Sequence, residues 1–344
     1  MAGNKNLSRA KNDKNDEFYT RLEDIENELY RYEKHFKDKI ILCNCDDPCE
    51  SMFWFYFHKK FNSLGLKKLI STHYNEGGKS FKLEYTGGND DDIYVGLKTD
   101  LEGDGDFRSD ECIELLKECD IVVTNPPFSL FIEFISIIFT YEKDFIVWGN
   151  INAITCKEIF PLIKDEKMWL GYLENSTCYF RIPDSYEKWD EKYTEKMNDG
   201  NKYAKVPSIT VFTNLDISKK HQPLDLVFFY EDNPEKYPKY DNYDSIEVSK
   251  VKDIPTDYEG VMGVPITYLG KHCPDQFEVI GIACGNSWAN YTKTLKALNF
   301  NPNIKYGGGL GNGVVNGKAK YARILIRNKN PKTKKEILGY WARI

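Results

Sequence analysis

The tetrapeptide Asn125-Pro126-Pro127-Phe128 has the residue types that are needed to hold an amino group. Two consecutive prolines lack backbone donors and stiffen a turn, so that the carbonyls beside them become fixed acceptors. Asn125 adds a side-chain carbonyl, and Phe128 adds a flat apolar face. Such a set can accept both hydrogens of an exocyclic amino group while an aromatic ring stacks on the ring that carries it. The structural alternative is a turn that ends a strand with a hydrophobic plug.

The segments on either side of this tetrapeptide predict that it lies at the end of a strand. The apolar run 120–124 predicts a short buried strand, and the apolar segment 130–139 predicts a helix. Open α/β sheets bind their ligands beyond the carboxyl ends of their strands. We therefore expect the tetrapeptide to line a cleft at the edge of a sheet.

Strand and helix patterns alternate from residue 39 to residue 149, which predicts an α/β fold with a doubly wound, parallel, Rossmann-like sheet. Strands are expected at 39–44, 68–73, 120–124 and 144–149, with hairpin strands at 79–85 and 93–97. Helices are expected at 24–36, 51–64, 109–118 and 130–139.

The periodicity weakens after residue 150. Further strands are expected at 167–172, 206–212 and 224–230, and a turn-rich stretch follows at 232–257. The segments 277–282 and 322–327 predict strands of a smaller C-terminal unit, with a glycine-rich loop at 307–313 between them. Three regions are therefore expected: a flexible basic arm at 1–16, a main domain at 17–230 and a smaller region at 231–344.

The net charge of −6 does not by itself favour a nucleic-acid partner, but the basic residues gather near the C-terminus. A locally basic end on an acidic body is compatible with phosphate binding, and a solvated charged face is the alternative. Along a flat strand, alternation places two lysines on one face and two arginines on the other face or past a bend. The four candidates are Lys318, Lys320, Arg323 and Arg327.

The nine cysteines do not predict a metal site. Cys43, Cys45 and Cys49 lie close together, but no second close pair completes a set of four zinc ligands. The N-terminus has no apolar signal segment, and no apolar run has the length of a membrane span. A cytoplasmic protein with reduced thiols and no membrane partner is expected.

The tetrapeptide resembles the catalytic motif of amino-group methyltransferases, which transfer a methyl group from S-adenosylmethionine to adenine N6, cytosine N4 or a glutamine amide. Three further motifs resemble the EcoRI-type adenine-specific DNA methyltransferases and occur in the same order. They are Asp-Glu-Phe-Tyr-Thr at 16–20, Cys-Asn-Cys-Asp-Asp-Pro at 43–48 and Gly-Val-Pro-Ile-Thr at 263–267. The similarity spans nearly the whole chain.

This resemblance implies methyl transfer from S-adenosylmethionine to N6 of an adenine that is flipped out of a specific sequence in double-stranded DNA. The tetrapeptide 125–128 would be catalytic, 17–230 the cofactor-binding catalytic domain and 231–344 the region that recognises DNA. The role would be orphan modification, or restriction-modification with a separately acting endonuclease. The alternatives are an amino methyltransferase that acts on RNA or protein glutamine, and a DNA-binding relative without catalysis.

The resemblance also implies the cofactor-binding residues. Thr20 would donate to the methionine carboxylate, Asp106 would accept from the cofactor's adenine amine, and Phe107 would line that ring. The full set is Phe18, Tyr19, Thr20, Asn44, Asp46, Asp47, Pro48, Asp106 and Phe107.

The chain departs from most methyltransferases at two cofactor-binding positions. The usual glycine loop after the first strand is replaced by Cys-Asn-Cys-Asp-Asp-Pro at 43–48. No acid directly follows the expected strand at 68–73, where the superfamily places its ribose-binding acid, and the nearest one is Glu76.

Overall fold

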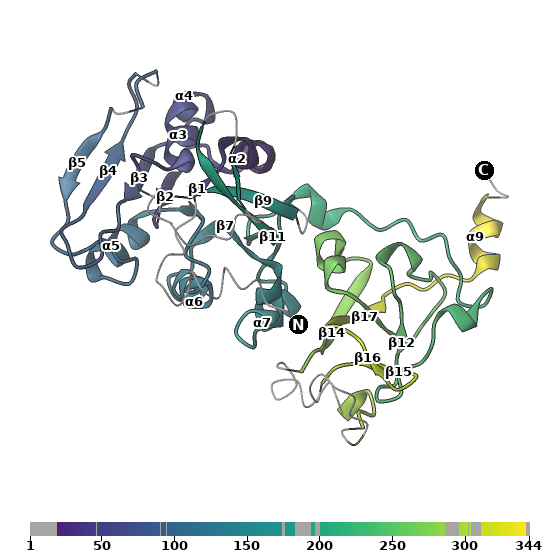
Figure 1. Cartoon of the computed structure of the whole chain (residues 1–344). Coiled ribbons are helices and arrows are strands. Elements are labelled where there is room, and N and C mark those ends of the chain that lie inside the picture. The colour runs from purple at the N-terminus through teal and green to yellow at the C-terminus, as the bar shows by residue number, and fades with distance from the viewer. Residues whose placement is uncertain are drawn as a thin grey trace. The chain divides into compact units, whose positions relative to one another are not determined.

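The computed structural model describes residues 19–45, 47–89, 91–93, 95–173, 176–182, 194–196, 200–285, 296–301, 303 and 311–341. The chain divides into two compact units (Figure 1). The first comprises Met1–Ile151 and Leu170–Ile217, and the second comprises Asn152–Trp169 and Ser218–Ile344. The expected division into an arm, a catalytic domain and a recognition region concerns function and stays a prediction.

A large mixed sheet forms the first unit, with the strand order β1-β9-β11-β7-β6-β2-β3-β4-β5. Its central strands are parallel: β3 (Lys68–Thr72), β2 (Ile40–Cys43), β6 (Ile121–Thr124) and β7 (Asp144–Asn150). Antiparallel strands flank them, namely β4 (Phe81–Tyr85) and β5 (Leu97–Asp100) on one side and β11 (Lys202–Thr213), β9 (Ser176–Arg181) and β1 (Tyr19–Thr20) on the other. β10 (Thr194–Lys196) also pairs with β11, and the short β8 (Trp169–Leu170) lies where the chain returns to this unit.

Helices cover both faces of this sheet in Figure 1, with α2, α3 and α4 on one side and α5 and α6 on the other. Their bounds are α2 (Leu22–Leu29), η1 (Tyr30–His35), α3 (Met52–Lys59), α4 (Phe61–Leu64), α5 (Asp110–Glu118) and α6 (Phe131–Thr140). The predicted α/β class is confirmed, but the sheet is mixed and not wholly parallel. The predicted helix 51–64 is α3 followed by α4, and Gly65 ends it in the left-handed conformation, at φ +64°.

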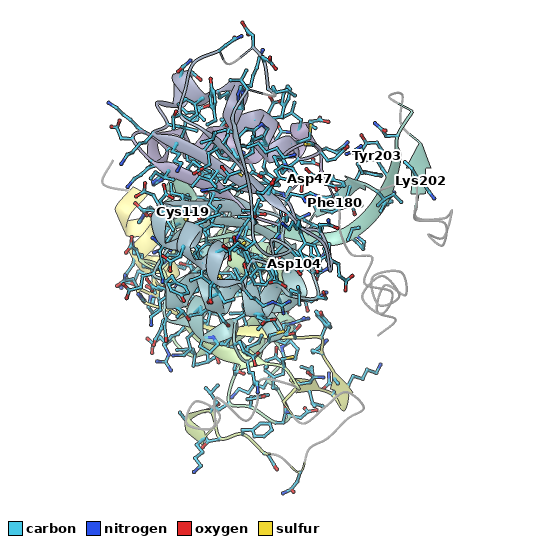
Figure 2. The ribbon with its side chains drawn as sticks, turned by 90° about the vertical axis from the view of Figure 1, so that its left-hand side faces the viewer. Asp47, Asp104, Cys119, Phe180, Lys202 and Tyr203 are labelled. Carbon is cyan, nitrogen blue, oxygen red and sulfur yellow. The ribbon has the colours of Figure 1, made fainter. Side chains whose placement is uncertain are left out.

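The position of β2 between β3 and β6 creates a topological switch point. The chain leaves β2 for β3 on one side and later returns to β6 on the other, and both neighbours run parallel to β2. Loops after two such strands separate and open a crevice at their carboxyl ends. Figure 2 shows Asp47 and Asp104 towards one edge of the sheet, whereas Cys119, which precedes β6, lies towards the opposite edge.

The predicted strand 206–212 is part of the longer β11, which pairs with β7 and β9 and carries a bulge between Val206 and Ile209. The expected strand at 224–230 is wrong, because this described segment forms only an isolated bridge between Phe228 and Pro255. An apolar alternation becomes a strand only where a neighbouring strand accepts its hydrogen bonds.

The second unit contains a smaller four-stranded sheet, which confirms the smaller C-terminal β structure. Its order is β12 (Ile246–Glu247), β13 (Val261–Pro265), β17 (Arg323–Asn328) and β14 (Phe277–Ala283). A hairpin of β15 (Val314–Val315) and β16 (Lys318–Ala319) accompanies it. Within the described residues, the helices of this unit include η2 (Ile151–Thr155), where the chain enters the unit, then α7 (Phe160–Lys164), η4 (Ser218–His221), η5 (Pro234–Lys236), η6 (Val251–Asp253), η7 (Ile266–Lys271) and α9 (Lys334–Trp341).

A buried carboxylate ties α2 to the segment that returns to the first sheet. Glu28 is 2% exposed, and it accepts hydrogen bonds from the amides of Tyr172 (2.8 Å) and Leu173 (2.6 Å) and from the Tyr32 hydroxyl (2.8 Å). A charged group can be buried only where such donors replace water. Burial raises the pKa of Tyr32 well above its usual range, and the charge of Glu28 and the hydrogen bond to its carboxylate add to the shift.

We expect Glu28→Ala to destabilise the protein by about 3 kcal/mol, because it leaves two partly buried backbone amides without their acceptor. The midpoint of urea unfolding measures this loss. Glu26→Ala removes an exposed carboxylate from the same helix and should change the midpoint little. Equal effects of the two substitutions would show that the Glu28 carboxylate does not hold this segment.

Candidate functional site

The predicted amine-binding turn lies directly after β6. Asn125 and Pro126 are buried, whereas Pro127 and Phe128 are partly exposed. The carbonyl of Pro127 accepts from the Leu130 amide at 2.9 Å, so the turn itself uses this acceptor before α6 begins. Asn125 and Pro126, the two buried residues of this turn, supply a side-chain carbonyl and a backbone carbonyl at the end of β6.

Asn44 lies directly after β2 and meets the end of β6 across the switch point. The Thr124 hydroxyl donates to the Asn44 carbonyl and thereby joins the two strand ends. Asn44 is buried, and within the described part of the chain its Oδ1 has no hydrogen-bond partner. A buried polar atom in this state points to a ligand or an ordered water at the position.

Strand β1 brings the segment 19–20 to the same edge of the sheet. Thr20 pairs with Phe180 of β9, and the Phe180 ring meets the Phe128 ring at 6.0 Å in an edge-to-face contact. Thr20 Oγ1 is buried and has no hydrogen-bond partner among the described residues. Residues that are far apart in the sequence, Thr20 and Phe128, are therefore joined through one aromatic side chain.

An ion pair connects the same region to the turn after β2. The Arg181 guanidinium lies 5.0 Å from the centre of the Tyr19 ring, and it forms an ion pair with Glu50. Pro48 is buried in the turn that precedes α3. Two other predicted cofactor residues, Phe18 and Asp46, lie outside the described residues.

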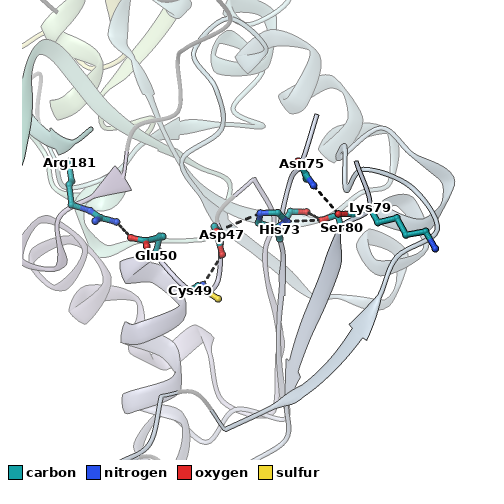
Figure 3. A network of polar contacts seen from close by, with 8 residues as sticks. All are labelled: Asp47, Cys49, Glu50, His73, Asn75, Lys79, Ser80 and Arg181. Carbon is teal, nitrogen blue, oxygen red and sulfur yellow. Dashed lines mark hydrogen bonds and ion pairs between the residues drawn. The ribbon is translucent and has the colours of Figure 1, made fainter. Parts of the chain in front are cut away.

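A polar network extends this region to the end of β3 (Figure 3). Asp47 Oδ1 accepts from the Cys49 amide at 2.9 Å, and Asp47 Oδ2 lies 3.7 Å from His73 Nε2. His73 Nδ1 lies 3.1 Å from the hydroxyl of Ser80, and Asn75 donates to the Lys79 carbonyl at 3.1 Å. The loops after the adjacent parallel strands β2 and β3 thus meet.

The loop that carries Asp106 and Phe107 is anchored on the same segment. The Asn75 amide donates to the Asp104 carbonyl at 2.8 Å. Gly105 has φ +81°, and a Cβ at this position would overlap the carbonyl oxygen of His73. Only glycine therefore permits this approach of the two backbones.

Asp106 is held by Arg108. Its Oδ1 accepts from the Arg108 amide at 2.8 Å and from Nε at 2.9 Å. The side-chain hydrogen bonds of Arg108 lower the pKa of Asp106, and its backbone hydrogen bond and positive charge add to the shift. Asp106 is therefore an ionised acceptor. The neighbouring Phe107 is buried, with its ring centre 5.1 Å from that of Phe134.

The four basic candidates occupy different environments in the second unit. Lys318 is exposed and Lys320 is partly exposed, on or beside β16. Arg323 Nη2 lies 2.8 Å from Oε1 of Glu247, whose side chain is 1% exposed. Arg327 is exposed, with its guanidinium 3.8 Å from the Glu278 carboxylate on the neighbouring strand. Arg323 thus has a structural partner, which distinguishes it from the two lysines.

The late motif at 263–267 also has a structural explanation. The Tyr240 hydroxyl donates to Glu247, the carboxylate that holds Arg323. A Cβ at Gly263 would overlap the Tyr240 hydroxyl, so the glycine makes room for this buried group. Sequence reasoning missed Glu247 and Tyr240, because nothing in the sequence marks them as partners of Arg323.

His73, Glu50 and Arg181 were also missed as site residues. The signal for His73 was its position at the carboxyl end of a predicted strand, which is where ligand-binding residues gather. Among the described residues, no group of three or more His, Cys, Asp or Glu side chains is arranged to hold a metal ion. In that same part of the chain, no helix is both long and apolar enough to cross a membrane.

Comparison with known proteins connects this geometry to a family. Residues 6–329 match the family model described as adenine-specific methyltransferase EcoRI. The type II methyltransferase M.EcoRI of Escherichia coli is 45% identical, over 95% of this chain and 98% of that protein. M.MpnI of Mycoplasma pneumoniae is 41% identical and M.MgeORF184P of Mycoplasma genitalium 40% identical, each over 94% of this chain and 98% of the relative. No solved structure matches.

We expect Gly105→Ala to destabilise the protein more than Gly77→Ala does. Both glycines have positive φ, which costs alanine about 1–2 kcal/mol, but only at Gly105 does the added methyl meet backbone. A Cβ at Gly77 would have open space around it. The midpoints of urea unfolding of the two variants measure this difference in stability. Equal midpoints would mean that the His73 segment moves away from the added methyl group at little cost in free energy.

Proposed function

The chain belongs to the EcoRI family of adenine-specific methyltransferases, and we propose that the carboxyl edge of its first sheet carries out the methyl transfer. The protein is an adenine-specific DNA methyltransferase of type II restriction-modification systems. The observation that carries the proposal is the turn 125–128 at the end of β6, joined to Asn44 across the switch point. Within this account the first sheet is the Rossmann-like sheet that binds the cofactor.

S-Adenosylmethionine, when bound, supplies a methyl group that its sulfonium makes electrophilic. Two observations support binding of this cofactor at the carboxyl edge of the first sheet. Thr20 Oγ1 and Asn44 Oδ1 are buried polar atoms without hydrogen-bond partners among the described residues. A hydroxyl and an amide suit the carboxylate and ammonium groups of an amino acid. We assign Thr20 and Asn44 to that end of the cofactor, and Asp106 and Phe107 to its adenine.

The target amine is a weak nucleophile because its lone pair is delocalised into the purine ring. Asn125 Oδ1 and the Pro126 carbonyl would accept the two N6 hydrogens, which draws the nitrogen towards sp³ geometry and directs its lone pair at the methyl group. Both acceptors are fixed before the substrate arrives, because Asn125 and Pro126 are buried at the strand end. Positioning and polarisation then carry the reaction without a covalent nucleophile.

The adenine must leave the duplex to reach this turn, since its amino group lies inside the base stack. Phe128 is partly exposed beside the two acceptors, and its ring can stack on the extruded base. We further assign recognition of the target sequence to the region 231–344, with Lys318 and Lys320 on DNA phosphates. The cognate endonuclease of such a system would act separately.

The family assignment favours adenine in DNA over the two alternative substrates, RNA and a protein glutamine. The matched family is described as adenine-specific, and the relatives are named type II methyltransferases. DNA from a host that expresses the chain should therefore contain N6-methyladenine in one sequence context. Sequencing that detects this base gives the activity and the target sequence together. Unmodified DNA from cells that contain folded protein would oppose the proposal.

We expect Asn125→Ala to lower the methylation rate by about 10²–10³-fold, because it removes one preorganised polar contact to the reacting amine. Binding of S-adenosylhomocysteine should change little, since Asn125 is assigned to the substrate. Methylation of a duplex oligonucleotide and calorimetric titration with S-adenosylhomocysteine measure the two quantities. Near-normal turnover of this variant would rule out the assigned mechanism.

The double variant Lys318→Ala/Lys320→Ala should reduce the slope of log K against log salt by about 0.9 for each phosphate that is no longer neutralised. Lys250→Ala/Lys252→Ala removes the same charge from other exposed positions of the second unit and serves as the control. DNA affinity is measured by fluorescence anisotropy across a salt series. If both double variants keep the wild-type slope, the two candidate lysines belong to a solvated face.

A further inference from the structure

Two acceptor groups face each other across the loops that follow β2 and β3 (Figure 3). These strands pair in parallel with Cys43 opposite Ser71, so that Asp47 and His73 leave the sheet side by side. Asp47 Oδ2 and His73 Nε2 are 3.7 Å apart, and both side chains are 24% exposed. The separation is too long for a direct hydrogen bond, and both groups remain accessible to a ligand.

The hydrogen bonds of Ser80 fix which nitrogen of His73 carries the hydrogen. The Ser80 hydroxyl donates its one hydrogen to the His73 carbonyl. It can therefore only accept from His73 Nδ1, which lies 3.1 Å away. In the neutral imidazole, Nδ1 then carries the hydrogen and Nε2 presents a lone pair towards Asp47. Stacking on Phe81, with ring centres 4.9 Å apart and planes 13° apart, holds the ring in this orientation.

Asp47 is oriented as firmly as His73. The Cys49 amide binds its Oδ1 at 2.9 Å, which leaves Oδ2 directed towards the imidazole. An ionised carboxylate only accepts hydrogen bonds. Two acceptors that face each other repel unless hydrogen-bond donors lie between them. The arrangement therefore fits a ligand that brings two adjacent donors.

We propose that Asp47 and His73 bind the two ribose hydroxyls of the cofactor, one hydroxyl to Oδ2 and the other to Nε2. This inference rests on the proposed function, because it concerns the nucleoside part of S-adenosylmethionine. A vicinal diol supplies two hydroxyl donors at a fixed short spacing. The pair takes the place of the acid that is absent directly after β3, and His73 becomes a cofactor-binding residue.

The loop assigned to adenine supports this placement. The Asp104 carbonyl accepts from Asn75, two residues after His73, and Gly105 packs against the His73 carbonyl. Asp106 and Phe107 follow directly in the chain. The residues assigned to the base and those assigned to the sugar are thus held by one segment, as a nucleoside site requires.

The test compares S-adenosylhomocysteine with its 2′-deoxy and 3′-deoxy analogues by calorimetric titration. The wild-type chain should bind the parent compound about 10- to 100-fold more tightly than the analogue that lacks the hydroxyl on Asp47. Asp47→Asn and His73→Phe should each bind the parent compound more weakly than the wild-type chain does. Each variant should also bind the parent compound no more tightly than one of the two analogues. His73→Phe keeps a ring for stacking on Phe81, and Asp47→Asn keeps the size of the side chain.

Glu76→Gln is the matched control, because Glu76 is the nearest alternative acid and is exposed in the loop after β3. This variant should keep the wild-type preferences. The inference is overturned if Glu76→Gln removes the preference for the diol, or if Asp47→Asn and His73→Phe both keep it. A wild-type chain that binds none of the three compounds would overturn the proposed cofactor itself, which is a different failure.

Discussion

The candidate site depends on the pairing of β2 with β3 on one side and β6 on the other. This pairing makes β2 the topological switch point of the first sheet and sets the loops after three strands at one edge. The Thr124 hydroxyl, which donates to the Asn44 carbonyl, fixes the distance between the two strand ends. Asn125 follows one of these ends and Asn44 the other, which brings together the residue proposed for the substrate amine and one proposed for the cofactor.

The antiparallel strands complete this edge with residues from both ends of the first unit. β11 extends from β7 to β9, and β9 carries β1. Phe180 joins the two halves, because it pairs with Thr20 in the sheet and packs its ring against Phe128. Buried Glu28 holds the chain where it enters this part of the unit. The positions of the segment 19–20 and of the turn 125–128 are therefore coupled through Phe180, by backbone pairing to the first and by a ring contact to the second.

Local patterns predicted the central strands and the position of the tetrapeptide, because short apolar runs between helices leave little choice. Partners that are distant in the sequence were not predictable in this way. The two residues of β1 form a strand only because β9 is present, and the apolar segment 224–230 lacks such a neighbour. The charge of Arg323 indicated DNA, whereas its fold partner Glu247 is visible only in the structure. The role proposed for His73 likewise depends on Ser80 and Asp47, which no spacing rule connects.

The most direct measurement of the central claim is a crystal structure with S-adenosylhomocysteine and a duplex that contains the methylated sequence. The account predicts that the target adenine is extruded, with N6 within hydrogen-bond distance of Asn125 Oδ1 and the Pro126 carbonyl. It also predicts that the cofactor spans from Thr20 and Asn44 to Phe107 along the carboxyl edge of the sheet. An adenine amine bound elsewhere, or a cofactor away from this edge, would contradict it.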